Sequence, residues 1–174
     1  DEDESASSGP AAGSKAVDAA TVATLKVSVK FTGDEISNKK LKMGADAACE
    51  SAHEKEAREQ KFVRNENSTM ANSFVVLKSR DLKAYKWADA GEKKLVDQIG
   101  CIYKPHVISM RAGQKVAYKN SDDTLHNVHP TPKKNKEVNI AMPFKDKTSD
   151  IKFSREEFMI PVKCNVHPWM IGYV

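Results

Sequence analysis

The spacing of one short segment near the end of the chain constrains the fold most. Cys164, His167 and Met170 follow one another at intervals of three residues in the segment CNVHPWM. A thiolate, an imidazole and a thioether together suit Cu(I), and a copper site with two imidazoles, one thiolate and a weak methionine ligand carries electrons in proteins. The missing imidazole is predicted to be His126, which precedes the segment NVH earlier in the chain. The sequence therefore predicts one metal site made by two distant segments.

The residues before His126 form a distinctive pattern. In 103–128, YKPHVISMRAGQKVAYKNSDDTLHNV, an aromatic-x-Pro strand leads through a glycine turn to an HNV segment. This pattern resembles that of the cupredoxin family. The C-x2-H-x2-M spacing is similar to the copper loop of amicyanin and shorter than that of plastocyanin. The match covers roughly 95–174. It implies one type 1 copper ion, with His126, Cys164 and His167 as equatorial ligands, Met170 as the axial ligand and Asn127 as an amide that ties the two loops together.

Hydrophobic periodicity predicts an all-β fold. Apolar residues alternate with polar ones from Leu25 to Phe31, in 138–142 and in 151–153, and a turn at Gly113 is predicted to join a hairpin of 107–111 with 114–119. Many short strands separated by turn signals are typical of β-sandwiches. We therefore expect a Greek-key, cupredoxin-like β-sandwich with an N-terminal extension of extra strands and one short helix.

The domain organisation follows from composition. Residues 1–21 are acidic and small, which predicts a tail or linker. Residues 22–174 are predicted to form one cupredoxin-like domain, with 22–95 as the extension and 96–174 as the copper-binding core. Within the extension we expect strands at 24–31, 39–43 and 73–77, and a helix inside 45–62 with Ser51 and Glu54 as a capping box.

Three cysteines leave a pair once the resemblance assigns Cys164 to copper. Cys49 and Cys101 could form a disulfide, which is typical of an oxidising compartment. With His53 and His106 they could instead form a Cys₂His₂ zinc site. The chain has no C-x2-C pair to nucleate zinc binding, so the disulfide is favoured over zinc, and two unpaired thiols come third.

The segment 164–170 is called the copper loop here. Several side chains in it or near it are candidates for docking or for alternative ligation. His129 could replace His126, but the resemblance selects the histidine that precedes Asn127. The copper loop is expected to hold His167 near the surface as the exit for electrons. The predicted docking surface contains Pro168, Trp169, Lys133, Lys134 and Lys136.

Composition narrows the function classes. The net charge is +4, and the lysines are not interleaved with aromatic residues as in single-strand nucleic-acid binders. No apolar run approaches the ~20 residues of a membrane helix. Five histidines are too few for a multicopper enzyme, and no residue pattern indicates hydrolysis. We therefore expect a protein that is not an enzyme, binds no nucleic acid and has no transmembrane segment.

The resemblance implies outer-sphere transfer of single electrons between redox partners. The partner would be a redox protein such as a c-type cytochrome or a membrane redox complex. The compartment would be the periplasm or the exterior of the cell, with the N-terminal tail as a tether. The alternative is an exported copper-binding protein for copper carriage or storage.

Overall fold

A computed structural model describes residues 15–18, 20–79, 81–86 and 91–174. The described residues divide into two compact units, one within 1–29 and 73–89 and the other within 30–72 and 90–174. In the first unit, β1 (Lys15–Ala16) pairs in parallel with β2 (Tyr85–Lys86), which follows the short 3₁₀ helix Asp81–Ala84. The predicted tail, 1–21, lies mostly outside the described residues.

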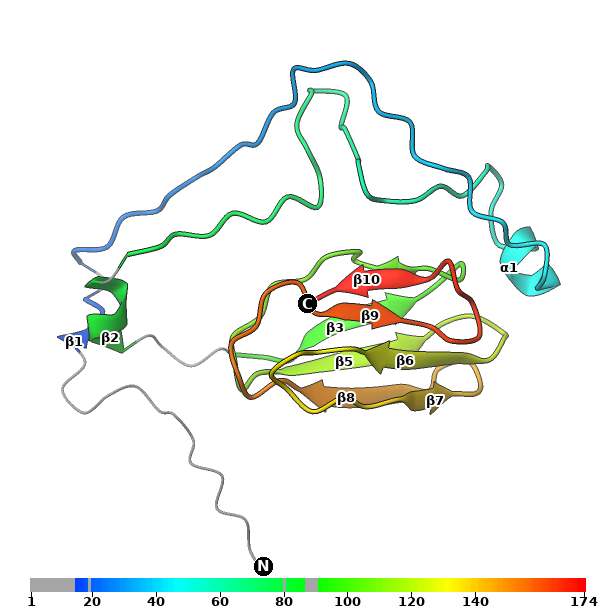
Figure 1. Ribbon diagram of the computed structural model, residues 1–174. Coiled ribbons are helices and arrows are strands. Elements are labelled where there is room, and N and C mark those ends of the chain that lie inside the picture. Colours follow the sequence, from blue (N-terminus) through cyan, green and yellow to red (C-terminus); the bar gives the residue numbers. More distant parts are fainter. Residues whose placement is uncertain (1–14, 19, 80, 87–90) are drawn as a thin grey trace, which may run out of the picture. The chain divides into compact units, whose positions relative to one another are not determined.

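Two four-stranded sheets form the second unit (Figure 1). One sheet has the order β4-β3-β5-β8, in which β3 (Lys94–Gln98) runs parallel to β5 (Lys115–Asn120). The edge strand β4 (Tyr103–Lys104) is antiparallel to β3, and the edge strand β8 (Thr148–Lys152) is antiparallel to β5. The other sheet has the antiparallel order β10-β9-β6-β7. Its strands are β6 (His126–Pro130), β7 (Ile140–Met142), β9 (Pro161–Lys163) and β10 (Ile171–Tyr173).

The inward faces of the two sheets share one core. Val116 and Tyr118 of β5 belong to the same buried cluster as Val128 of β6 and Val162 of β9. Alternate residues of a strand point to opposite faces, so the strand periodicity places these side chains together. The hydroxyl of Tyr103 also joins the sheets, because it lies 2.9 Å from the carbonyl oxygen of Asn127 and 3.0 Å from that of Lys163. The predicted all-β sandwich is confirmed.

The predicted short helix is present but begins earlier than expected. Helix α1 spans Ala47–Ser51, and Asp46 caps it by accepting hydrogen bonds from the amides of Ala48 and Cys49. The capping box at Ser51 and Glu54 is therefore wrong. A helix of five residues is too short to be stable alone, and the disulfide of Cys49 holds it against the rest of its unit. None of the helices in the described ranges is long and apolar enough to cross a membrane.

Three predicted strands of the extension do not form as ladders. In 24–31 and 39–43 the structure has only the isolated bridges Lys30–Thr69 and Lys40–Arg58, and 73–77 has no strand. Leu25 is 70% exposed and Leu77 is 66% exposed. Alternation describes a surface that a strand could bury, but pairing also needs a neighbouring strand with a matching register. The sequence pattern contains no information about that neighbour.

The predicted hairpin of 107–111 with 114–119 is also wrong. Val107 forms a parallel bridge with Tyr173, and the amide of Ile108 donates to the carbonyl of Tyr173. Strand β5 pairs instead with β3 and β8. Gly113 does form a turn, with φ of +89°, but this turn carries the chain between the two sheets.

Candidate metal centre

Neighbouring strands of one sheet bring the predicted ligands together. His126 opens β6, and Cys164 follows β9, which lies beside β6 in the register His129–Lys163. His167 and Met170 lie in the loop that joins β9 to β10. The loop is closed by hydrogen bonds from the amide of Met170 to the carbonyl of His167 and from the amide of Cys164 to the carbonyl of Met170. The same end of the sandwich therefore carries all four residues.

Three donor atoms converge within 4.8 Å of one another, from His126, Cys164 and His167. The two Nδ1 atoms are 2.9 Å apart, and Cys164 Sγ is 3.8 Å from His167 Nδ1. A four-coordinate ion with bonds of ~2.0 Å to nitrogen and ~2.3 Å to sulfur separates its ligand atoms by roughly 3.3–3.8 Å. The sulfur-to-nitrogen distance fits this range, and the imidazoles need to separate by only about half an ångström. The residues therefore fit a copper ion.

The centre is shielded from solvent. The exposed fractions are 0% for His126, 3% for Cys164, 2% for His167 and 1% for Met170. The expected position of His167 near the surface is wrong, because Asp46 and Cys49, in the N-terminal segment 30–72, lie against its ring. Cys49 Sγ lies 3.6 Å from His167 Nε2.

Local electrostatics prepare the thiol and one imidazole for metal binding. Burial raises the pKa of the Cys164 thiol, but hydrogen bonds from His126 and from backbone amides outweigh it and leave the pKa below its ordinary value. Burial lowers the pKa of His126, whereas hydrogen bonds with Asp122 and Cys164 raise it to about 9. Burial is also the main reason why the pKa of His167 is lowered. Hydrogen bonding therefore favours the deprotonated form of Cys164 and the protonated form of His126.

Two carboxylates that the sequence reasoning missed hold the outer nitrogens of the imidazoles. His126 Nε2 lies 2.9 Å from Asp122 Oδ2, and His167 Nε2 lies 3.0 Å from Asp46 Oδ2. A hydrogen bond from Thr124 is the main cause of the low pKa of Asp46, about 2. Asp122 stands four residues before His126, which is a usable sequence signal. Asp46 has no such signal except its place three residues before Cys49.

Asn127 and His129 occupy the other face of β6. The side-chain oxygen of Asn127 accepts a hydrogen bond from the backbone amide of Asn165. The side chain of Asn127 therefore joins β6 to the copper loop. His129 Nδ1 lies 2.9 Å from Asn165 Oδ1, and its Nε2 lies 2.7 Å from Glu137 Oε1. Because neighbouring strand residues point to opposite faces, His129 is directed away from the donor atoms of His126.

The disulfide predicted between Cys49 and Cys101 is confirmed, with an S–S distance of 2.01 Å. The alternative Cys₂His₂ zinc site is wrong, because both sulfurs are bonded to each other. His53 instead bonds the carbonyl of Gly100 through Nε2 at 2.7 Å. His106 packs against the ring of Tyr173.

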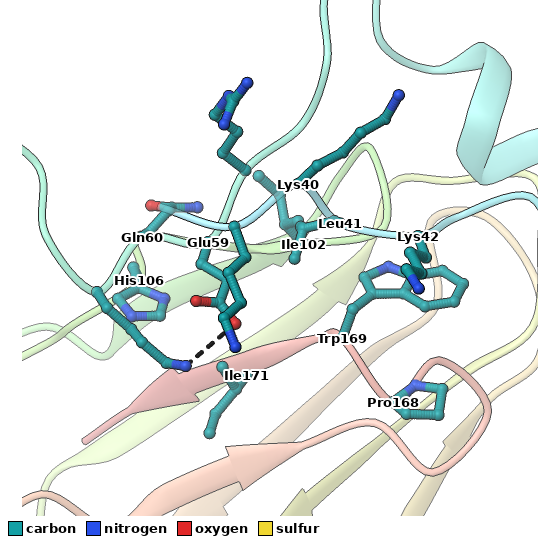
Figure 2. Close-up of a pocket in the computed structure, with 13 residues that line it drawn as sticks. Lys40, Leu41, Lys42, Glu59, Gln60, Ile102, His106, Pro168, Trp169 and Ile171 are labelled. Carbon is teal, nitrogen blue, oxygen red and sulfur yellow. Dashed lines mark hydrogen bonds and ion pairs between the residues drawn. The ribbon is translucent and has the colours of Figure 1, made fainter. Parts of the chain in front are cut away.

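Trp169 and Pro168 form part of the wall of a groove beside the copper loop (Figure 2). The indole of Trp169 lies 5.1 Å from the ring of His167 and donates a hydrogen bond to the carbonyl of Cys101. The groove has a volume of about 380 Å³. Its charged lining consists of Glu59 and five cations, Lys39, Lys40, Lys42, Arg58 and Lys61. A positively charged depression therefore borders Trp169, whose ring packs against that of His167.

The other predicted docking residues lie elsewhere. Lys133, Lys134 and Lys136 belong to the connection between β6 and β7, and these strands are paired with His126 opposite Met142. The connection is therefore at the end of the hairpin opposite His126. The carboxylate of Glu157 accepts hydrogen bonds from the amides of Lys133 and Lys134. The expectation that these lysines adjoin the metal centre does not hold.

No protein-family model and no curated protein sequence matches this chain. Among solved structures, an amicyanin variant in the Cu(I) form matches with a TM-score of 0.42 and 23% identity, covering 51% of this chain and 84% of its own. A purple cupredoxin from Nitrosopumilus maritimus matches with a TM-score of 0.41 and 19% identity, covering 47% and 97%.

A copper-containing nitrite reductase from Thermus scotoductus SA-01 has a TM-score of 0.43 and 18% identity over 47% of this chain. The match spans 21% of the reductase, about one fifth of its length. The predicted cupredoxin-like sandwich rests on the two sheets described above, and the function is argued from the site itself.

Proposed function

We propose that this protein carries single electrons on one type 1 copper ion held by His126, Cys164 and His167, with Met170 as the axial ligand. The observation that carries the proposal is the convergence of two imidazole Nδ1 atoms and one thiol within 4.8 Å in a buried site. Bound copper would supply a couple between Cu(I) and Cu(II). A thiolate, two imidazoles and a thioether are the ligand set of blue-copper electron-transfer sites.

The scaffold favours electron carriage over copper carriage or storage, because it holds the ligands in fixed positions. His126 and Cys164 are attached to paired strands, and Asn127 joins their segments through the amide of Asn165. Ligands held by packing and hydrogen bonds keep their geometry, so the two oxidation states would share nearly one arrangement. Copper carriage or storage, the alternative function, requires exchange of the metal. The nearly complete burial of Cys164 and His167 disfavours rapid exchange.

The same site favours electron carriage over an enzymatic role. In the part of the chain that the structure describes, the groups of His, Cys, Asp and Glu that could hold a metal all include His126 or His167. Two of these groups also contain a disulfide-bonded cysteine. We therefore propose a single copper ion and no separate substrate-binding metal. The disulfide supports export to the periplasm or the cell exterior, since such bonds persist in oxidising compartments.

We further propose that electrons leave through Trp169 rather than through an edge of His167. The indole is half-buried, contacts His167 and lines the cationic groove. The partner would be a redox protein with an acidic surface, such as a c-type cytochrome or a membrane redox complex. Opposite charges accelerate encounter by long-range attraction.

A matched pair of histidine variants tests the ligand assignment. His126→Ala should remove the intense visible absorption of the copper-loaded protein, because one equatorial donor is lost. His129→Ala should retain it, because that ring points away from the site and bonds Glu137. Absorption spectra of the two oxidised, copper-loaded variants make the comparison. The reverse outcome would assign the ligand to His129 and overturn the proposed set.

A charge variant tests the docking surface. Lys39→Gln combined with Lys42→Gln should slow the oxidation of the reduced protein by ferricyanide, a small anion, by about tenfold at low salt. The difference should fade as salt rises, because the Debye length is ~8 Å at physiological salt and shorter at higher salt. The triple variant Lys133→Gln, Lys134→Gln and Lys136→Gln is the matched control and should stay close to wild type. Stopped-flow rates that fall only in the triple variant would place the entry for anions at the other end of the sandwich.

A further inference from the structure

A cluster of side chains outside the metal ligands surrounds both imidazoles. We propose that Asp46, Cys49, Cys101 and Asp122, called here the clasp, act as one unit that fixes both histidines with Nδ1 toward the metal. The inference rests on the proposed copper site and adds positioning residues to it. None of the four side chains belongs to the ligand set.

Each carboxylate of the clasp contacts one histidine. Asp122 Oδ2 is 2.9 Å from His126 Nε2, and Asp46 Oδ2 is 3.0 Å from His167 Nε2. A carboxylate that accepts the Nε2 proton fixes the tautomer and leaves the Nδ1 lone pair for the metal. Consistent with this role, the two Nδ1 atoms face each other at 2.9 Å.

Each carboxylate also accepts a hydrogen bond from the backbone of one half of the disulfide. The amide of Cys49 donates to Asp46 Oδ1 at 3.3 Å. The amide of Cys101 donates to Asp122 Oδ2 at 2.8 Å, and that of Gly100 donates to Asp122 Oδ1 at 2.6 Å. The disulfide joins the two half-cystines covalently. Each carboxylate therefore holds one histidine on one side and one half-cystine on the other.

The backbone at Cys101 supports a positioning role. Its φ is +52°, in the left-handed region that non-glycine residues seldom adopt, and Gly100 beside it has φ of +66°. Such a conformation costs free energy and persists where surrounding contacts impose it. Here it directs two consecutive amides at the carboxylate of Asp122.

The two halves of the clasp have different attachments. Asp122 lies in the connection between β5 and β6, four residues before His126, so the sandwich itself positions it. Asp46 lies on the N-terminal segment as the cap of α1, where Thr124 also donates to its Oδ2 at 2.8 Å. The disulfide closes a sequence separation of 52 residues. Loss of the disulfide should therefore disturb His167 more than His126.

Asparagine variants test the clasp. Asp46→Asn keeps the ability to cap α1, because asparagine and aspartate are comparable caps, and Asp122→Asn keeps the side-chain size. Both changes should accelerate copper loss from the Cu(I) protein to excess bathocuproine by about ten- to a hundredfold, the usual effect of outer-shell carboxylates. The reduction potential should rise, since a negative charge beside an imidazole is lost. Asp123→Asn removes an exposed carboxylate next to Asp122 and should change neither quantity.

The disulfide tests the coupling between the two halves. The double variant Cys49→Ala with Cys101→Ala should accelerate copper loss, and adding Asp46→Asn should produce little further acceleration, because both changes release the same imidazole. Multiplied rates would show that disulfide and carboxylate act independently and would overturn the clasp. If the cysteine variant fails to fold, the comparison of Asp46→Asn with Asp123→Asn decides: equal rates and potentials contradict the proposal.

A measurement on the metal-free protein separates the clasp from the proposed function. Nitrogen NMR should show a protected Nε2 proton on His167, and Asp46→Asn should remove that protection while the fold persists. Unprotected Nε2 protons in wild type would reject the clasp whatever metal binds. Wild-type protein without a thiolate-to-copper band would instead reject the proposed function and leave this NMR result unchanged.

Discussion

Replacing Cys164 with serine should abolish the intense visible absorption of the copper-loaded protein. The absorption of a blue-copper site depends on a thiolate bound to Cu(II), and a serine oxygen at this position supplies no sulfur. The change is nearly isosteric, and the hydroxyl can occupy the buried space of the Cys164 thiol. The fold should therefore persist while the affinity for Cu(I), which prefers a soft ligand, falls by at least a hundredfold. Absorption spectroscopy and competition with a Cu(I) chelator measure the two effects.

A control comes from the other cysteines. The sulfurs of Cys49 and Cys101 are bonded to each other and should not replace the missing thiolate. If colour survives in Cys164→Ser but disappears when the disulfide is removed, the thiolate ligand comes from Cys49 or Cys101. That outcome would contradict the assignment of the copper loop.

The second large effect concerns pH. The pKa of His126 in the metal-free protein is raised to about 9, since its bonds to Asp122 and Cys164 outweigh the effect of burial. A raised pKa means that the imidazole holds a proton throughout the range from neutral to about pH 9, and a metal must displace it. Binding coupled to release of one proton gains about tenfold in affinity for each pH unit. Copper affinity should therefore increase roughly a hundredfold from pH 7 to 9 and level off above.

The slope distinguishes two protonation states of Cys164. Release of the His126 proton alone gives a slope of one proton, and the lowered pKa of Cys164 favours this slope. Chelator competition at a series of pH values measures the slope. A slope of two protons would mean that Cys164 is a thiol in the metal-free site. A flat profile would mean that His126 is already neutral, and Asp122→Asn should then have no influence on the profile.

The sequence was informative where function imposes local spacing. Cys164, His167 and Met170 lie within one short loop, so their proximity follows from chain length alone. The partner His126 could be selected because its segment resembles a known family pattern, and β6 does lie beside β9. The cysteine pair could be predicted because one of three cysteines was already assigned. These predictions required no knowledge of how distant segments pack.

The N-terminal segment shows what the sequence could not determine. Alternation from Leu25 to Phe31 indicated a strand, but the described structure has no ladder there, because pairing depends on a partner that periodicity does not specify. The contact of Asp46 with His167 joins residues 121 positions apart. Asp46 caps a short helix, which is a local role. Its contact with His167 depends on the three-dimensional fold and has no local signal in the sequence.

The lysines of the predicted docking surface lie away from the candidate metal centre for a related reason. Lys133, Lys134 and Lys136 are close to His126 in sequence, but an extended strand advances ~3.3 Å per residue. The strand β6 carries the chain away from the candidate metal centre before these lysines occur. The cations that border the copper loop come from the segment 39–61, which is distant in sequence.

The central claim is that one copper ion, bound by Cys164 and two histidines, cycles between two oxidation states in a fixed site. Titration of the metal-free protein with Cu(II), followed by visible absorption and then by reversible voltammetry, tests it most directly. We expect an intense thiolate-to-copper band that saturates at one equivalent and a reversible one-electron wave. Weak absorption that continues to grow beyond one equivalent, with copper lost on reduction, would contradict electron carriage and favour copper transport or storage.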